Sequence, residues 1–113
     1  MPRFAANLTV LHTGHGFLDR FAAARGDGFG GVEYLFPYAL PKEALAEALE
    51  RNGLAQALHD PPAGDRETGE RGIACQPDRA GEFRDGVGRA IEYAAALRCP
   101  QVNCLALQLL SEV

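Results

Sequence analysis

Residues that can bind or transfer protons are concentrated in one stretch of the chain, residues 58–79. They include His59, Asp60, Asp65, Arg66, Glu67, Glu70 and Arg71. Most of this stretch has neither helical nor strand periodicity, and loops of that length are usually functional or disordered. An apolar patch, Ile73-Ala74-Cys75, lies among the polar residues and argues against disorder. We therefore expect residues 61–77 to form an ordered wall over a polar small-molecule site, with Ile73 or Cys75 partly buried. The alternative is a solvated surface loop.

Three of the polar residues allow more than one interpretation. His59 ends a predicted strand and either donates to a substrate oxygen or is a buried histidine with satisfied hydrogen bonds. Glu33 lies in an otherwise apolar strand and must face solvent, a ligand or a partner charge, because burying it unpaired is costly. Arg71 either holds a carboxylate in a bidentate manner or only pairs with Glu67 or Glu70.

Three other motifs have the wrong context for a specific site. The glycine-dense residues 26–31 run from a helix into a strand, whereas the dinucleotide fingerprint runs from a strand into a helix. Residues 64–69 have the spacing of a phosphate loop, but Glu70-Arg71 stands where Lys-Ser/Thr is required. His12 and His15 have metal-ligand spacing without acidic or sulfur companions, so a surface turn is favoured.

Composition narrows the class of protein. The 113 residues are enough for one domain, and 47% apolar with 23% charged residues is typical of a globular protein. No window is apolar enough to span a membrane, and a net charge of −4 without a basic cluster argues against nucleic acid. The three cysteines fit no ligand spacing, so we expect reduced thiols in a cytoplasmic protein, with Cys99 and Cys104 as small core residues.

Hydrophobic periodicity predicts alternating strands and helices. Strands are expected at residues 4–11, 32–36, 54–59 and 101–105, and helices at residues 17–25, 41–52 and 83–97. The second helix has an apolar stripe of Leu45, Ala48 and Leu49. The expected stripe of the third helix is Phe83, Val87, Ala90, Ile91, Ala94 and Leu97. This order indicates an α/β fold with a parallel sheet and right-handed crossovers.

In parallel α/β folds, ligands bind at the carboxyl ends of the strands. Here those ends carry Asn7, Glu33, His59 and Asn103, and the long loop leaves from the third strand. The predicted substrate-binding residues are Asn7, Glu33, His59, Asp65, Glu70 and Arg71.

Several segments resemble hydroxypyruvate isomerases. The opening matches in Arg3-Phe4-Ala5-Ala6-Asn7-Leu8, in Gly31-Val32-Glu33 and in Phe36-Pro37-Tyr38. The most specific part is Pro62-Ala63-Gly64-Asp65 with Gly69-Glu70-Arg71-Gly72-Ile73-Ala74-Cys75. The match continues in Glu82-Phe83-Arg84-Asp85-Gly86-Val87 and in Val102-Asn103-Cys104-Leu105, so that it covers about residues 3–106.

This resemblance implies a TIM barrel of the xylose-isomerase-like superfamily, with residues 1–113 as a single domain forming its first half of four strands and three helices. Enzymes of the family interconvert hydroxypyruvate and tartronate semialdehyde, and close relatives isomerise 2-oxo-tetronates. Two glutamates move the proton and, with an aspartate and a glutamine or histidine, can hold a divalent ion. All of these lie in the second half, so no catalytic or metal-binding residue and no cofactor is assigned to this chain.

The end of the sequence departs from the family, which continues after Ala106 with a glycine-containing loop and four more β/α units. We therefore expect a truncated form that is inactive alone, with a small hydroxy-keto acid as its substrate if the barrel is completed. One alternative is a non-catalytic half-barrel that dimerises or binds a partner protein; another is a closed small α/β domain with a separate binding role. Because four parallel strands cannot close a barrel, we also expect self-association through the uncovered sheet.

Overall fold

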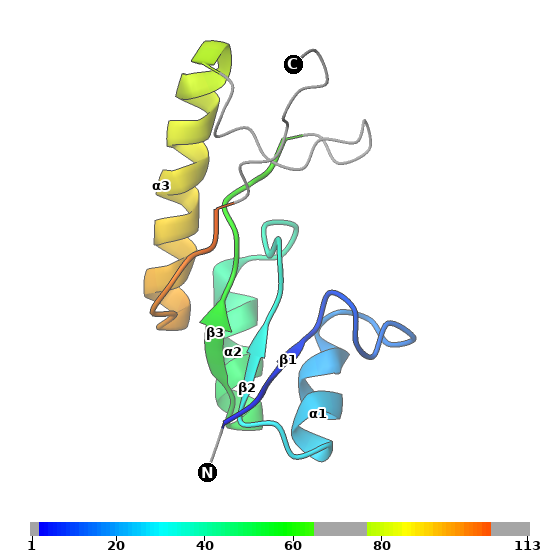
Figure 1. The fold of residues 1–113 in the computed structure, drawn as a ribbon. Helices are drawn as coiled ribbons and strands as arrows, with labels where there is room; N and C mark the ends of the chain where they lie inside the picture. Colours follow the sequence, from blue (N-terminus) through cyan, green and yellow to red (C-terminus); the bar gives the residue numbers. More distant parts are fainter. Residues whose placement is uncertain (1–2, 65–76, 105–113) are drawn as a thin grey trace.

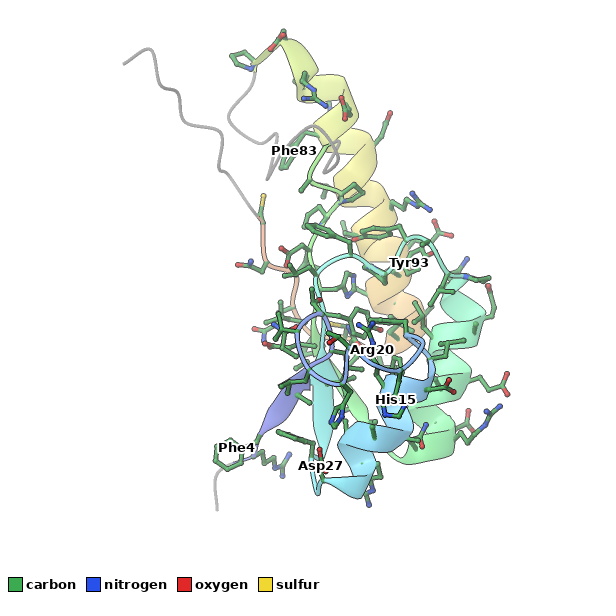
Figure 2. The ribbon with its side chains drawn as sticks, turned by 90° about the vertical axis from the view of Figure 1, so that its right-hand side faces the viewer. Phe4, His15, Arg20, Asp27, Phe83 and Tyr93 are labelled. Atoms are coloured by element: carbon green, nitrogen blue, oxygen red, sulfur yellow. The ribbon has the colours of Figure 1, made fainter. Side chains whose placement is uncertain are left out.

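The computed structural model describes residues 3–64 and 77–104. Its sheet has three strands in the order β1 (Ala5–Asn7), β2 (Gly31–Glu33) and β3 (Ala55–Leu58), and all pair in parallel. The helices are α1 (Asp19–Gly26), α2 (Lys42–Asn52) and α3 (Ala80–Leu97), which follows the short 3₁₀ helix η2 (Pro77–Arg79). All three α-helices lie on one side of the sheet (Figures 1 and 2). The predicted α/β fold with a parallel sheet is confirmed.

Alternation along the strands determines which side chains face the helices. Ala6 and Leu8 on and after β1, and Val32 and Tyr34 on and after β2, are buried in the core. Successive strand residues point to opposite faces, so Asn7 and the residues in register with it point away from the helices. The core cluster comprises Ala6, Leu8, Phe21, Ala24, Val32, Tyr34, Leu45, Ala48, Leu49, Leu54, Tyr93, Leu97 and Cys99.

The first two strands are shorter than predicted because polar groups end them. The Asn7 side-chain oxygen accepts a hydrogen bond from the Thr9 backbone N–H at 3.0 Å, and the backbone turns there. The Thr9 hydroxyl then accepts a hydrogen bond from the Leu35 N–H at 3.0 Å. The Leu35 N–H is therefore not available to donate to a neighbouring strand. Both β1 and β2 therefore end at the row that contains Asn7 and Glu33, which are register partners.

Helix α2 agrees with the sequence prediction. Pro41 precedes the first turn, Gly53 ends the helix in the left-handed region at φ 63°, and the predicted stripe of Leu45, Ala48 and Leu49 is buried. These are local signals: a proline is favoured next to a helix start, and a glycine adopts a positive φ without strain.

Helix α3 agrees with the predicted stripe only in part: Ala90 and Leu97 are buried as predicted, whereas Gly86 and Tyr93 were not in the stripe. Its buried residues are Gly86, Ala90, Tyr93 and Leu97, whereas Ile91, expected in the apolar stripe, is 60% exposed. Tyr93 determines the orientation because its hydroxyl donates to the Leu40 carbonyl oxygen at 2.6 Å and its ring packs on Tyr38. The predicted stripe left out Tyr93, whose side chain is labelled in Figure 2.

The segment after α3 forms a parallel bridge between His59 and Val102 rather than a regular strand in the described residues. Arg98, at φ 52°, ends the helix, and Pro100 has no N–H to donate. The sheet therefore has three regular strands where four were predicted, and Leu105 of the predicted fourth strand lies outside the described residues. Cys99 is buried as expected, but Cys104 is exposed, so its assignment to the core was wrong. None of the described helices is long and apolar enough to cross a bilayer.

Candidate functional site

Polar side chains from separate parts of the chain meet at the carboxyl ends of the strands. Asn7 and Glu33 are register partners on β1 and β2. Asp60 follows β3, and Asn103 lies beside it through the bridge between His59 and Val102. The described residues therefore combine two carboxyl groups with two amides at one edge of the sheet, of which Asn7 and Glu33 belong to the predicted site.

Asp60 is the most constrained of these residues. It is fully buried, its backbone N–H donates to the Leu35 carbonyl oxygen at 2.8 Å, and its Oδ1 lies 3.4 Å from Asn103 Nδ2. Its Oδ2 has no hydrogen-bond partner among the described residues. Burial raises the pKa of Asp60 to about 6; the Asn103 hydrogen bond partly opposes this rise, and the negative charge of Glu33 adds to it. The carboxyl group therefore changes charge close to neutral pH.

His59 lies on the helix side of the sheet. It is fully buried, and its Nε2 lies 3.0 Å from the Ala90 carbonyl oxygen of α3, so the neutral ring carries its proton on Nε2. Its Nδ1 has no partner within the described ranges. Burial lowers the pKa of His59, and the bond to Ala90 partly opposes that shift. This position agrees with the buried histidine considered as the alternative in its burial, but only one of the two ring nitrogens has a partner among the described residues. A direct contact of His59 with substrate stays a prediction.

Tyr38, in the segment between β2 and α2, holds the backbone of Asp60 in place. The Tyr38 hydroxyl donates to the backbone carbonyl oxygen of Asp60. Arg89 of α3 donates to the Tyr38 carbonyl oxygen at 3.1 Å, and its guanidinium lies 5.0 Å from the centre of the Tyr38 ring. Burial, together with the nearby Asp60 charge, raises the pKa of Tyr38, so the phenol remains a proton donor. Helix α3 thus holds the end of β3 in place through Tyr38.

The long loop after β3 starts as a packed segment. Pro61 and Ala63 are buried, and Pro62 packs against Gly86 of α3. A Cβ atom at Gly86 would lie 3.2 Å from Pro62 Cδ, so the helix comes close to the proline ring because Gly86 has no side chain. The predicted site residues Asp65, Glu70 and Arg71 lie outside the described residues, as do Ile73 and Cys75. The predicted wall over the site therefore stays a prediction.

The described residues do not form a metal site of their own. Among them, no group of three or more histidine, cysteine, aspartate or glutamate side chains is placed to hold a metal ion. Glu33 and Asp60 supply two acidic groups, and the neighbouring Asn7 and Asn103 are amides. We therefore assign no step to a metal ion.

A hollow of about 570 Å³ lies at the other end of the sheet. It is lined by Ala46, Leu49, Glu50, Leu54, Ala55, Gln56, Ala96, Leu97 and Arg98, where α2 ends and β3 begins. The lining comes in equal parts from α2, from the start of β3 and from the end of α3, and most of it is apolar. It shares no residue with the polar group at the carboxyl ends.

Of the six predicted site residues, Asn7 and Glu33 lie at this edge of the sheet, and the structure shows that they face away from the helices. Asn103 was recognised at a strand end but was not included in the site. Asp60 was counted among the proton-binding residues but was not included in the predicted site. Period-two alternation indicates that His59 and Asp60 face opposite sides, and the structure shows which of them faces the helices.

Comparisons with known proteins agree with this arrangement. Residues 21–111 match the family model described as xylose isomerase-like TIM barrel. Over 105 residues the chain is 52% identical to hydroxypyruvate isomerase of Escherichia coli, covering 93% of this chain and 41% of that protein. Over 106 residues it is 49% identical to 2-oxo-tetronate isomerase of Cupriavidus necator, covering 94% of this chain and 41% of the relative.

A solved structure has the same fold. A crystal structure of an AP endonuclease, family 2, from Brucella melitensis superposes with a TM-score of 0.91 at 45% identity. The match covers 94% of this chain and 41% of the solved chain. The present chain thus spans about 41% of the length of these curated relatives.

Proposed function

Because the chain belongs to the xylose isomerase-like TIM barrel family, we propose that it supplies the first β/α units of a hydroxypyruvate isomerase-type barrel and binds a small hydroxy-keto acid. One observation carries the proposal. Asn7, Glu33, Asp60 and Asn103 gather at the carboxyl ends of parallel strands, where ligands of such folds bind. Two relatives that share about half of the aligned residues with this chain are a hydroxypyruvate isomerase and a 2-oxo-tetronate isomerase.

The charges suggest how such a ligand is oriented. Hydroxypyruvate and 2-oxo-tetronates both carry a carboxylate, a ketone and a hydroxyl group on the carbon next to the ketone. A substrate carboxylate is repelled by Glu33 and by ionised Asp60, so the hydroxyl end is expected to face these residues. The substrate carboxylate is then left for Arg71, a predicted binding residue outside the described ranges, because a guanidinium suits a carboxylate by its fork geometry.

We further propose that this chain binds the ligand but does not turn it over. Moving a proton between neighbouring carbons needs a placed base, an acid and stabilisation of the enediolate charge. Of the carboxyl groups placed above, Asp60 is closed to solvent, which leaves Glu33 as the accessible one. One accessible carboxyl group with amide neighbours suits binding better than the two-residue proton transfer.

The test is a titration of isotope-labelled protein with hydroxypyruvate, followed by amide NMR. We expect saturable shifts of the amides near Asn7, Glu33 and Asp60, and no shifts around the hollow at the amino-terminal end of β3. Glu33→Gln should change the affinity, whereas Glu50→Gln, at that hollow, should leave it unchanged. Saturable shifts confined to the hollow, or no shifts at all, would contradict the proposed site.

A turnover assay on the same sample tests the second part of the proposal. No tartronate semialdehyde should appear, with or without a divalent metal ion. Turnover that is abolished by Glu33→Gln and kept by Glu50→Gln would place proton transfer in this part of the barrel.

The uncovered sheet favours a second candidate, a module that self-associates. Within the described residues, β1 pairs only with β2, and the far edge of β3 has only the bridge at His59. Ala5, at the start of β1, is exposed. Unpaired edges of this kind tend to pair with another chain.

Light scattering over a wide range of protein concentration tests this candidate. We expect dimers or larger species, and Ala5→Lys should shift them toward monomer because lysine on an edge strand opposes pairing. Ala22→Lys, which changes an exposed alanine of α1, is the matched control and should keep the association. A wild-type protein that is monomeric at every concentration would rule the module out.

A further inference from the structure

The side-chain amide of Asn103 is held from two directions. The Asn103 backbone N–H donates to the His59 carbonyl oxygen at 3.0 Å, which fixes the residue beside the end of β3. Its side-chain Nδ2 lies 3.4 Å from Asp60 Oδ1. Asn103 as a whole is exposed, whereas Asp60 is fully buried. The amide therefore lies between a buried carboxyl group and the open side of the site.

The chemistry of the two groups allows one orientation of that amide. An ionised carboxylate only accepts hydrogen bonds, whereas a primary amide has an accepting oxygen on one side and a donating nitrogen on the other. Asn103 must therefore turn its nitrogen toward Asp60, which turns its oxygen away. Asparagine at position 60 would not impose this choice, because an amide can either donate to Asn103 or accept from it.

We propose that Asp60 is a positioning residue that orients the Asn103 amide, so that Asn103 Oδ1 faces the open side as an acceptor for a ligand hydroxyl. The nature of the ligand rests on the proposed function; the orientation of the amide does not. The proposal makes Asn103 a specificity-determining residue. A hydroxy-keto acid can donate to it, and a keto acid without the hydroxyl cannot.

The surroundings of Asp60 explain how it can serve as a fixed acceptor. Its backbone is held by Leu35 and by the Tyr38 hydroxyl, and packing of Arg89 on Tyr38 keeps that hydroxyl in place. The titratable groups that face it are Glu33 from β2 and Tyr38 from the following segment. The adjacent His59 is bonded to α3 on the other side of the sheet. Above about pH 6 the carboxyl group is ionised and accepts only, and below it the added proton releases the choice of amide orientation.

NMR of the whole chain tests the orientation directly. In the wild type we expect the Asn103 side-chain amide signals to shift with pH, with the same midpoint as the Asp60 carboxyl carbon. Asp60→Asn should abolish this pH-dependent shift, because asparagine has nearly the same size as aspartate but does not titrate. Asp60→Leu should also remove the protection of the amide protons from solvent exchange, provided that the variant folds. Glu33→Gln is the control: it should keep the shift and lower its midpoint, because a like charge is removed.

A ligand arm tests the selectivity. Above pH 6, hydroxypyruvate should shift the Asn103 side-chain signals, whereas pyruvate, which lacks the hydroxyl group, should not. The positioning role is overturned if the Asn103 amide does not respond to pH in the wild type, or if the pH-dependent shift disappears in Glu33→Gln and persists in Asp60→Asn. If neither keto acid binds anywhere, the proposed function fails, and the pH titration still decides whether Asp60 orients the Asn103 amide. Equal shifts with both ligands overturn the selectivity.

Discussion

His59 and Asp60 are adjacent in the chain, yet their side chains lie on opposite sides of the sheet. His59 Nε2 is 3.0 Å from the Ala90 carbonyl oxygen of α3, whereas Asp60 Oδ1 is 3.4 Å from Asn103 Nδ2. Both residues are fully buried. Burial disfavours the charged form of each, so it raises the pKa of Asp60 to about 6 and lowers the pKa of His59. The two shifts make stability depend on pH with opposite signs.

Asp60→Asn should stabilise the protein at neutral pH. Because the pKa of Asp60 is raised from 3.8 to about 6, the native state binds its proton more tightly than the unfolded chain does. The free energy of unfolding of the wild type therefore falls as pH rises from about 4 to about 6, and it stays lower above that range. The asparagine variant lacks this loss, so above pH 6 it should be more stable by on the order of 2 kcal/mol. Urea denaturation across this pH range measures the difference, which should disappear near pH 4. A constant difference at every pH would contradict the assignment.

His59→Gln should remove the opposite dependence. The lowered pKa of His59 means that the unfolded chain binds the proton more readily, so the wild type loses stability as pH falls below about 6.5. Glutamine keeps a donor for Ala90 and carries no charge. In the same urea series, His59→Gln should therefore lose less stability on acidification than the wild type does. His15→Gln, which changes an exposed histidine, should retain the wild-type loss.

Tyr38→Phe should cost about 1 kcal/mol, the typical net contribution of one hydrogen bond. The variant keeps the ring that packs on Arg89 and Tyr93, and loses the donor to the Asp60 carbonyl oxygen. Tyr34→Phe is the matched control. The Tyr34 hydroxyl is buried beside Gln56, whose side chain partly opposes the rise in the pKa of Tyr34 that burial causes, but no hydrogen bond of ordinary geometry joins the two groups in the described structure. Its removal should change the free energy of unfolding by less than about 0.5 kcal/mol, since no partner is lost. Equal costs in chemical denaturation would contradict the role of Tyr38.

Gly88→Ala and Gly86→Ala should have different effects although both glycines lie in α3. Alanine stabilises a helix interior by up to about 1 kcal/mol relative to glycine. A Cβ atom at Gly88 meets nothing within 4 Å, so Gly88→Ala should show this gain. At Gly86 the Cβ atom would lie 3.2 Å from Pro62 Cδ, and crowding against the proline ring should cancel the gain. Thermal unfolding of both variants checks this, and an equal rise in melting temperature would show that Pro62 yields freely.

The sequence by itself determined the order of the elements, the parallel sheet and the buried stripe of α2. These features depend on local signals, such as apolar spacing, a proline before the first turn and a glycine after the last. It also placed Asn7 and Glu33 at one edge, because the carboxyl ends of parallel strands coincide there. The resemblance to hydroxypyruvate isomerases depended on short runs of residues that the sequence shows directly.

The tertiary structure decided which way the side chains face. His59 and Asp60 are both polar, so a period-two pattern cannot tell which of them points to the helices, and a shift of one residue exchanges them. The register shift between Val32 and Glu33 in the pairing of β2 with β3, and the Ala90 carbonyl of α3, settle the matter in favour of His59. In α3, Tyr93 rather than Ile91 faces the core, because its hydroxyl reaches Leu40. Both outcomes depend on a backbone oxygen from a distant segment, and such partners exist only once the chain has folded.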